Sequence, residues 1–316
     1  MKTRSKNSAK GFTLIELLVA MAITTVIITI LVSVTAMSLN VWNRSRSEIR
    51  AARQGKAMID TMARDFESLV VRKGNAFEWL YANSNPTSEG PKGNQSPNAI
   101  DLIFFSAATD RYDGKIGVAG VDLGGDVSTI GYQLVYKDPI DSSTTDDFKT
   151  FVLYRKLVDP KETFDDILGQ ATLDGKVDFI SGGTDSVSAE ENFICENVYQ
   201  FTITFHLRIT DSTTPPATIR TVRVPIGQGA NSAENLVIAG DGITNIARTG
   251  ITTISNTTKE EIKSAQLSAA EISLTVLTNF GLQQLRKRTF ENDTAKAEFI
   301  AQNSYQYSKL VQVPGS

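Results

Sequence analysis

The side chains that most often carry out catalysis or bind transition metals are scarce in this chain of 316 residues, which has one cysteine, Cys195, and one histidine, His206. A single cysteine excludes an intramolecular disulfide and any cysteine-based zinc cluster. A single histidine between Phe205 and Leu207 in an alternating stretch is typical of a strand residue and leaves little for a serine triad. We find no nucleophile–base pair, and we therefore predict that the protein is not an enzyme and carries no cofactor.

Three segments rich in aspartate and glycine offer the oxygen ligands that calcium prefers. They are residues 110–113 (DRYD), 122–126 (DLGGD) and 181–185 (SGGTD). None has the spacing of a defined calcium loop, and glycine and aspartate are the residues that ordinary turns favour. The GxxxxGK[ST] pattern of a phosphate-binding loop is also missing from the sequence. We expect turns at these segments and no bound metal.

The charge balance argues against a nucleic-acid partner. There are 32 basic and 35 acidic residues and the net charge is -3, so the basic excess that holds a phosphate backbone is missing. The short cluster Arg286, Lys287 and Arg288 is typical of a solvated surface.

The N-terminal segment has the composition of a membrane anchor. Residues 1–10 contain four basic residues and no acid, and residues 12–42 are apolar with Glu16 as their only charge. Residues 17–39 carry no formal charge and would span ~35 Å as a helix, enough to cross a bilayer core. We predict a transmembrane helix over residues 12–42. The alternative is a cleaved secretory signal, but the apolar run is longer than that signal needs and no A-x-A-like site closes it. Basic residues flank both ends, so charge alone does not decide the orientation.

The residues KGFTLIELLVAMAI resemble the signal of type IV prepilins and type II secretion pseudopilins. The shared features are a basic leader, Gly11 before the aromatic Phe12, and Glu16 at the fifth position counted from Phe12, all ahead of an apolar helix. The resemblance implies that a prepilin peptidase cleaves between Gly11 and Phe12 and methylates the amino group of Phe12. It also implies a single-pass inner-membrane protein with its leader, residues 1–11, in the cytoplasm and its C-terminal domain in the periplasm.

The resemblance assigns a role to Glu16, and the chemistry of a carboxylate at this position also favours that role. A carboxylate near the end of a membrane helix is costly unless it pairs or lies at the interface. In the first helical turn it interacts favourably with the helix dipole, and after cleavage the nearest cation is an amino terminus. In the family this glutamate neutralises the amino terminus of a neighbouring subunit during filament assembly. The alternative is a glutamate that lies unpartnered among the lipid headgroups.

The helix is expected to continue beyond the membrane. Residues 43–72 contain no proline, and apolar residues recur at the three-and-four spacing of an amphipathic helix, with Gly55 as a weak point. We predict a stalk helix over residues 43–73 whose apolar face packs on a sheet.

A β-rich domain is expected over residues 74–290, followed by a tail at 291–316. Residues 83–98 have the composition of a loop. Alternation then predicts strands at 99–106, 129–137, 150–158, 198–209, 219–224 and 272–280. A long helix followed by an antiparallel sheet is an α+β fold of pilin-like layout.

The order of the later segments resembles the J-type minor pseudopilin and its W-type relative in type IV pili. The features are ARQGKAMIDTMARDFES, YQLVYK with FVLYRKL, ENVYQFTITFHLR, and EISLTVLTNFGLQQLRKR. Some long prepilin-like cassette proteins of Verrucomicrobia have a similar extended architecture. The resemblance implies a minor subunit at or near the tip of a secretion pseudopilus, with I- and K-type subunits, the major pseudopilin, prepilin peptidase and membrane lipid as partners. The alternatives are a minor pilin of a type IV pilus, acting in motility, adhesion or DNA uptake, and a membrane-anchored binding domain that never polymerises.

Overall fold

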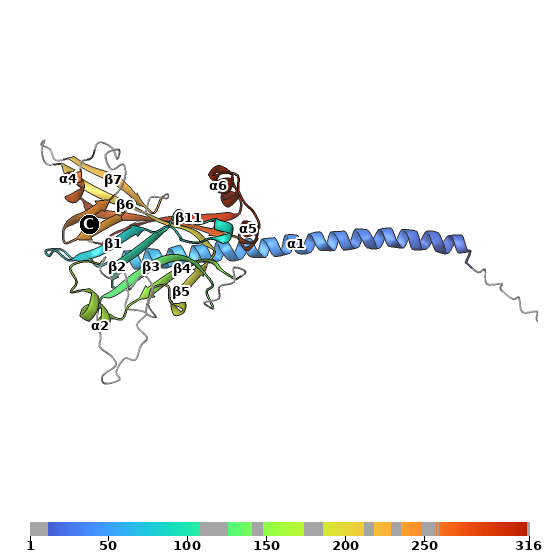
Figure 1. Cartoon of the computed structure of the whole chain (residues 1–316), viewed down its shortest axis with the longest axis horizontal. Coiled ribbons are helices and arrows are strands. Elements are labelled where there is room, and N and C mark those ends of the chain that lie inside the picture. Colours follow the sequence, from blue (N-terminus) through green and yellow to red (C-terminus); the bar gives the residue numbers. More distant parts are fainter. Residues whose placement is uncertain are drawn as a thin grey trace, which may run out of the picture. The chain divides into compact units, whose positions relative to one another are not determined.

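A computed structural model describes residues 12–107, 126–140, 148–173, 186–211, 218–228, 235–247, 257 and 259–314. A long N-terminal helix is followed by two antiparallel sheets, which is the α+β architecture expected from the sequence and is consistent with a pilin-like fold (Figure 1). The chain divides into two compact units, Met1–Glu48 and Ile49–Ser316. We call the second one the globular unit.

Helix α1 spans Leu14–Glu67 and runs through both units. Within the first unit its apolar side chains are exposed, and the helix is long and apolar enough by length and composition to cross a membrane. Such an exposed apolar surface requires a cover of lipid or protein, because apolar side chains gain free energy when they leave water.

In the globular unit α1 becomes amphipathic and buries one broad face. Its buried residues are Ala51, Gly55, Met58, Ile59, Met62, Ala63, Asp65 and Phe66. The helix ends at Glu67, a few residues before the expected end of the stalk. The reason is local: the amide of Val70 donates to the carbonyl of Phe105 (2.9 Å), so the chain leaves the helix to follow a strand.

The larger sheet has seven strands in the order β5-β4-β3-β2-β1-β8-β9. Their bounds are β1 Glu78–Ser84, β2 Ile100–Ser106, β3 Ser128–Lys137, β4 Thr150–Leu157, β5 Phe193–Glu196, β8 Asn235–Ala239 and β9 Gly242–Ala247. All neighbouring pairs are antiparallel.

The smaller sheet has four strands in the order β11-β10-β6-β7, and all its pairs are also antiparallel. Their bounds are β6 Val198–Asp211, β7 Thr218–Ile226, β10 Gln266–Leu277 and β11 Ser304–Gln312. The helices besides α1 are short: α2 Pro160–Glu162, α4 Lys259–Lys263, α5 Asn279–Leu285 and α6 Asp293–Gln302, with 3-10 turns at Pro91–Gly93 and Glu190–Asn192 and a π-helical turn at Thr163–Ile167.

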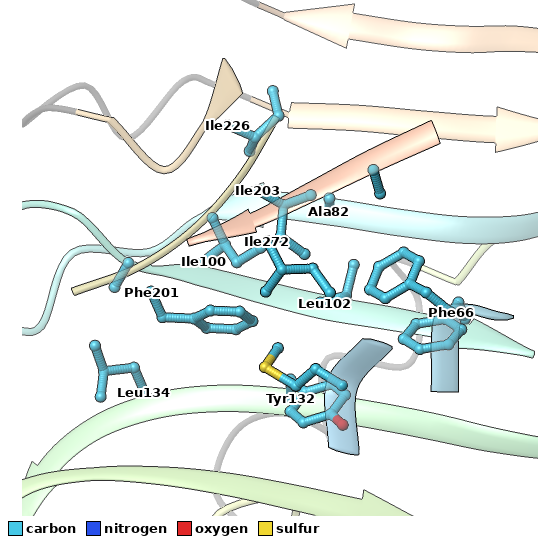
Figure 2. Close-up of a cluster of buried hydrophobic side chains, with 14 of the residues drawn as sticks. Phe66, Ala82, Ile100, Leu102, Tyr132, Leu134, Phe201, Ile203, Ile226 and Ile272 are labelled. Atoms are coloured by element: carbon cyan, nitrogen blue, oxygen red, sulfur yellow. The ribbon is translucent and has the colours of Figure 1, made fainter. Parts of the chain in front are cut away.

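The core lies where the two sheets and the end of α1 meet. Figure 2 shows Leu102 and Tyr132 of the larger sheet, Ile203 and Ile272 of the smaller sheet, and Phe66 of α1 gathered in one apolar cluster. The ring centroids of Phe66 and Phe104 are 4.7 Å apart, so the helix end packs directly on β2. Burial of these large apolar side chains is the main force that holds α1 to the sheets.

The predicted strands correspond to β2, β3, β4, β6 and β7, with bounds that differ by one or two residues, and to β10. The strand expected at 272–280 was wrong in its bounds, because β10 spans Gln266–Leu277 and residues 279–280 belong to helix α5. The structure adds β1, which runs into the expected loop at 83–98, and the short strands β5, β8 and β9. It also places α6 and β11 in the segment expected to be a tail, where β11 pairs with β10 along its whole length. The residues that follow α5 are therefore part of the globular unit.

Candidate processing and assembly site

The start of α1 is built around Thr13 and Glu16. The side chain of Glu16 accepts hydrogen bonds from the amide and the hydroxyl of Thr13, both at 2.9 Å, and the amide of Glu16 donates to the Thr13 hydroxyl oxygen at 3.3 Å. This reciprocal pattern is a capping box, in which each side chain satisfies a backbone amide that the first helical turn leaves free. Glu16 thus fixes the position where the helix begins.

Phe12, one half of the predicted cleavage site, lies just before this cap and is exposed. Gly11, the other half of the predicted cleavage site, lies outside the described residues. The predicted assembly residue Glu16 is exposed in the first turn, close in sequence to the amino terminus that cleavage would create.

The globular unit holds its own part of α1 through a buried ionic group. The guanidinium of Arg155 on β4 donates to both carboxylate oxygens of Asp65, at 2.7 Å each, and its Nε also lies 3.1 Å from the hydroxyl of Tyr132 on β3. The Tyr132 hydroxyl donates to the same carboxylate. Burial, followed by the negative charge of Asp65, raises the pKa of Tyr132, so the phenol stays protonated and remains a donor. We call Asp65, Tyr132 and Arg155 the helix lock.

Strand β11 provides a second attachment for α1. The Tyr307 hydroxyl donates to the carbonyl of Ala52 at 2.9 Å, and Lys309 pairs with Asp60 at 2.9 Å. Gly55 lies directly beneath Tyr307, and a β-carbon at that position would overlap the tyrosine ring. The glycine identified as a weak point of the helix thus lies at a close approach between α1 and β11.

The single cysteine and the single histidine of the chain lie on different sheets. Cys195 on β5 is buried, and burial raises the pKa of its thiol to about 12, so the thiol stays protonated at neutral pH. His206 on β6 has its Nε2 3.7 Å from a carboxylate oxygen of Glu271, which itself pairs with Arg223. This is a cross-strand charge cluster on one face of the smaller sheet.

Among the residues that the structure describes, no three histidine, cysteine, aspartate or glutamate side chains are grouped to hold a metal ion. The aspartate- and glycine-rich segments at 110–113 and 181–185 lie outside the described residues, as does all of 122–126 except Asp126.

Comparison with known families supports the interpretation of the N-terminus. Residues 6–32 match the family model described as the prokaryotic N-terminal methylation motif. Comparisons with curated proteins and with solved structures found no match. The matched segment contains Gly11, Phe12 and Glu16, and it supports a type IV prepilin-like protein with a membrane-anchoring helix.

Two functional features were missed by sequence reasoning. The first is the capping box, which could have been predicted because a T-x-x-E spacing ahead of an apolar run, here Thr13 and Glu16, is its sequence signature. Asp65 gave no such signal, because its burial depends on Arg155, which lies on a distant strand.

Proposed function

We propose that the protein is a minor filament subunit of the pseudopilin type, most similar to the J-type subunit of a type II secretion pseudopilus. Prepilin peptidase would cleave between Gly11 and Phe12 and methylate Phe12, and the subunit would then join a periplasmic filament at or near its tip. The observation that carries this proposal is the methylation motif at residues 6–32, which includes the start of the exposed apolar part of α1.

The apolar helix, Glu16 and the globular unit each suit one step of this proposal. The apolar half of α1 would lie in the inner membrane before assembly and among neighbouring helices afterwards, because both surroundings cover apolar side chains. Glu16 would exchange its capping partner, Thr13, for the amino terminus of a neighbouring subunit, a charged donor that binds a carboxylate more strongly than a neutral one. The globular unit would offer its surface to I- and K-type subunits and to the major pseudopilin.

The mechanism is assembly and no chemical step is assigned to the protein. The helix lock and the β11 contacts join α1 to the globular unit, so a force that moves the helix would also move the unit. A subunit of a filament that pushes other proteins outward needs this coupling.

The incorporation test compares Glu16→Ala with Glu48→Ala, the matched removal of the other acidic residue in the first unit. Both variants are co-expressed with the peptidase and the companion subunits, and the sheared filament fraction is probed for the protein. We expect Glu16→Ala to be processed but missing from filaments, while Glu48→Ala is incorporated. Equal incorporation of both variants would contradict the assigned role of Glu16.

The two alternatives predict different results in the same strains. A minor pilin of a type IV pilus would be recovered with a retractile pilus, and its deletion would abolish motility, adhesion or DNA uptake while protein secretion continues. A non-polymerising anchored domain would stay in the membrane fraction, and its phenotype would survive Glu16→Ala.

A further inference from the structure

The end of the globular unit where α1 enters carries basic residues that are far apart in the sequence. Arg50 on α1 and Arg286, just after α5, line one cleft of about 580 Å³. Lys92 donates to the carbonyl of Lys287 at 2.8 Å, and the guanidinium of Arg288 lies 5.3 Å from the ring centroid of Phe299. We call this region, from Arg50 and Arg286 to Lys92, Lys287, Arg288 and Lys296, the basic end.

Few carboxylates of the described residues neutralise the cations of the basic end. Among the residues that the structure describes, Lys92, Arg286, Lys287, Arg288 and Lys296 form no ion pair with a carboxylate. Lys296 donates to the carbonyl of Gln95 at 2.9 Å.

The acids at this end are arranged differently. Glu89 pairs with Lys149 at 3.3 Å, and Asp138 accepts from the amide of Ile140 at 3.0 Å. Asp293 interacts with Lys296 without pairing with it, and Glu196 lines the cleft. An anion from outside the molecule would therefore find donors here that the described carboxylates do not occupy.

Arg286 has a further unmet requirement. One of its terminal nitrogens donates to the carbonyl of Lys149, but its Nε–H is buried and has no acceptor among the residues that the structure describes. A buried donor without an acceptor costs free energy. A ligand whose oxygen atoms could accept this hydrogen bond would therefore bind here more favourably.

The same cleft is lined by two exposed apolar side chains. Ile140 is 83% exposed and Phe148 is 71% exposed, which are the highest values for large apolar residues that the structure describes in the globular unit. Cations beside exposed aliphatic and aromatic side chains are the combination that binds the boundary between lipid headgroups and acyl chains.

Arg50 is also close in sequence to the predicted membrane segment. Arg50 follows the predicted membrane segment by about two helical turns, and Arg44, Arg46 and Arg53 surround it in the sequence. In Figure 1, α5 and α6 lie at the same end of the globular unit as the start of its α1 segment, whereas α4 lies at the far end. The basic end thus continues the basic stretch that flanks the membrane segment.

We propose that the basic end binds anionic phospholipid headgroups of the membrane that holds the apolar half of α1, and so docks the globular unit on the bilayer before assembly. Arg50, Arg286, Lys287 and Arg288 would contact the phosphates, and Ile140 and Phe148 would enter the interface. This inference rests on the proposed membrane-anchored subunit and adds a lipid ligand to it.

The test uses the full chain in nanodiscs that hold one copy each, made of phosphatidylcholine alone or with phosphatidylglycerol. Gln283→Cys, on the exposed rim of the cleft, carries an environment-sensitive fluorophore, and Ser264→Cys beside α4 carries the same label as a control. Cys195 need not be replaced, because its thiol is buried and protonated.

We expect the Gln283→Cys label to shift to the blue only with phosphatidylglycerol, and the shift to weaken at high salt. Lys287→Ala should lower the ratio of docked to free units about fivefold, the contribution of one basic residue near an anionic surface, whereas Lys263→Ala on α4 should leave it unchanged. Both lysines are exposed, so neither change should impair folding.

Three outcomes would overturn the inference. One is equal emission in the two lipids, and another is an equal effect of Lys287→Ala and Lys263→Ala. The third is a shift that appears only when discs hold several copies, which would assign the surface to a protein neighbour. A chain that fails to enter either nanodisc, scored by co-elution with the disc, would instead refute the membrane anchor of the proposed function.

Discussion

Removal of Arg155 from the helix lock should be among the most destabilising single changes outside the apolar core. The side chains of Arg155 and Asp65 are only 4% and 5% exposed, and the two charges share two hydrogen bonds of 2.7 Å. Arg155→Met keeps most of the volume but leaves the carboxylate buried with Tyr132 as its remaining donor. Breaking a buried pair in this way costs about 3–5 kcal/mol of unfolding free energy.

Urea unfolding of the full chain in detergent measures this cost. Trp79 on β1 is buried and reports the globular unit, whereas Trp42 lies on the exposed half of α1 and changes little. The matched control is Lys309→Met, which breaks the ion pair with Asp60, where the two side chains are 40% and 45% exposed. That loss should be below about 1 kcal/mol, because exposed pairs contribute little.

The double variant Asp65→Leu with Arg155→Met measures how strongly the two charged side chains interact. It removes both charges, so its cost should be smaller than the sum of the two single changes. If Arg155→Met costs no more than Lys309→Met, the buried ion pair does not hold α1 to the sheets and the reasoning fails.

Three other changes test local features. Thr13→Val removes the capping hydroxyl that Glu16 shares, and it should destabilise the start of α1 by about 1 kcal/mol, seen as faster amide exchange in the first turn, whereas Thr13→Ser should not. Gly55→Leu should displace Tyr307 and lower the melting temperature of the globular unit, and unchanged stability would contradict the close approach. Burial raises the pKa of Asp101 from 3.8 to about 7. The folded state therefore holds a proton that the unfolded state releases near pH 4, so stability should fall between about pH 4 and pH 7, and Asp101→Asn should flatten that dependence.

The apolar helix and the six expected strands could be predicted because their signals are local. A long run without charge identifies the apolar helix, and short segments rich in β-branched and aromatic residues identify the strands, including β2, in which every residue is buried. The motif at Gly11, Phe12 and Glu16 is likewise contiguous in the chain.

Strands β1 and β11 were missed because their stability is not local. In β1, Glu78–Ser84, the short apolar run Trp79, Leu80 and Tyr81 leads directly into a segment rich in turn-forming residues, so a short window gives little strand signal. In β11 most side chains are exposed or half-buried, and the strand is held by its pairing with β10 and its contacts with α1. A partner strand found far away in the chain gives no signal in a short window.

The helix lock and the basic end depend on the same kind of distant pairing. Asp65 is buried on α1 although charged residues near it in the helix, such as Lys56 and Arg64, are exposed, and its partners lie on the distant strands β3 and β4. The cluster at Arg286, Lys287 and Arg288 was interpreted as a solvated surface, and the structure adds Arg50, Lys92 and Lys296 to it from three other segments.

The central claim is that the protein is a processed prepilin-like subunit, and the intact mass and N-terminal sequence of the protein from native membranes test it most directly. The measurement is made with and without prepilin peptidase, and with Gly11→Val as a variant that should resist cleavage. The account predicts a chain that begins at methylated Phe12 only when the peptidase and Gly11 are both present. A chain that still begins at Met1 with the peptidase present, or one cut beyond Trp42, would contradict it.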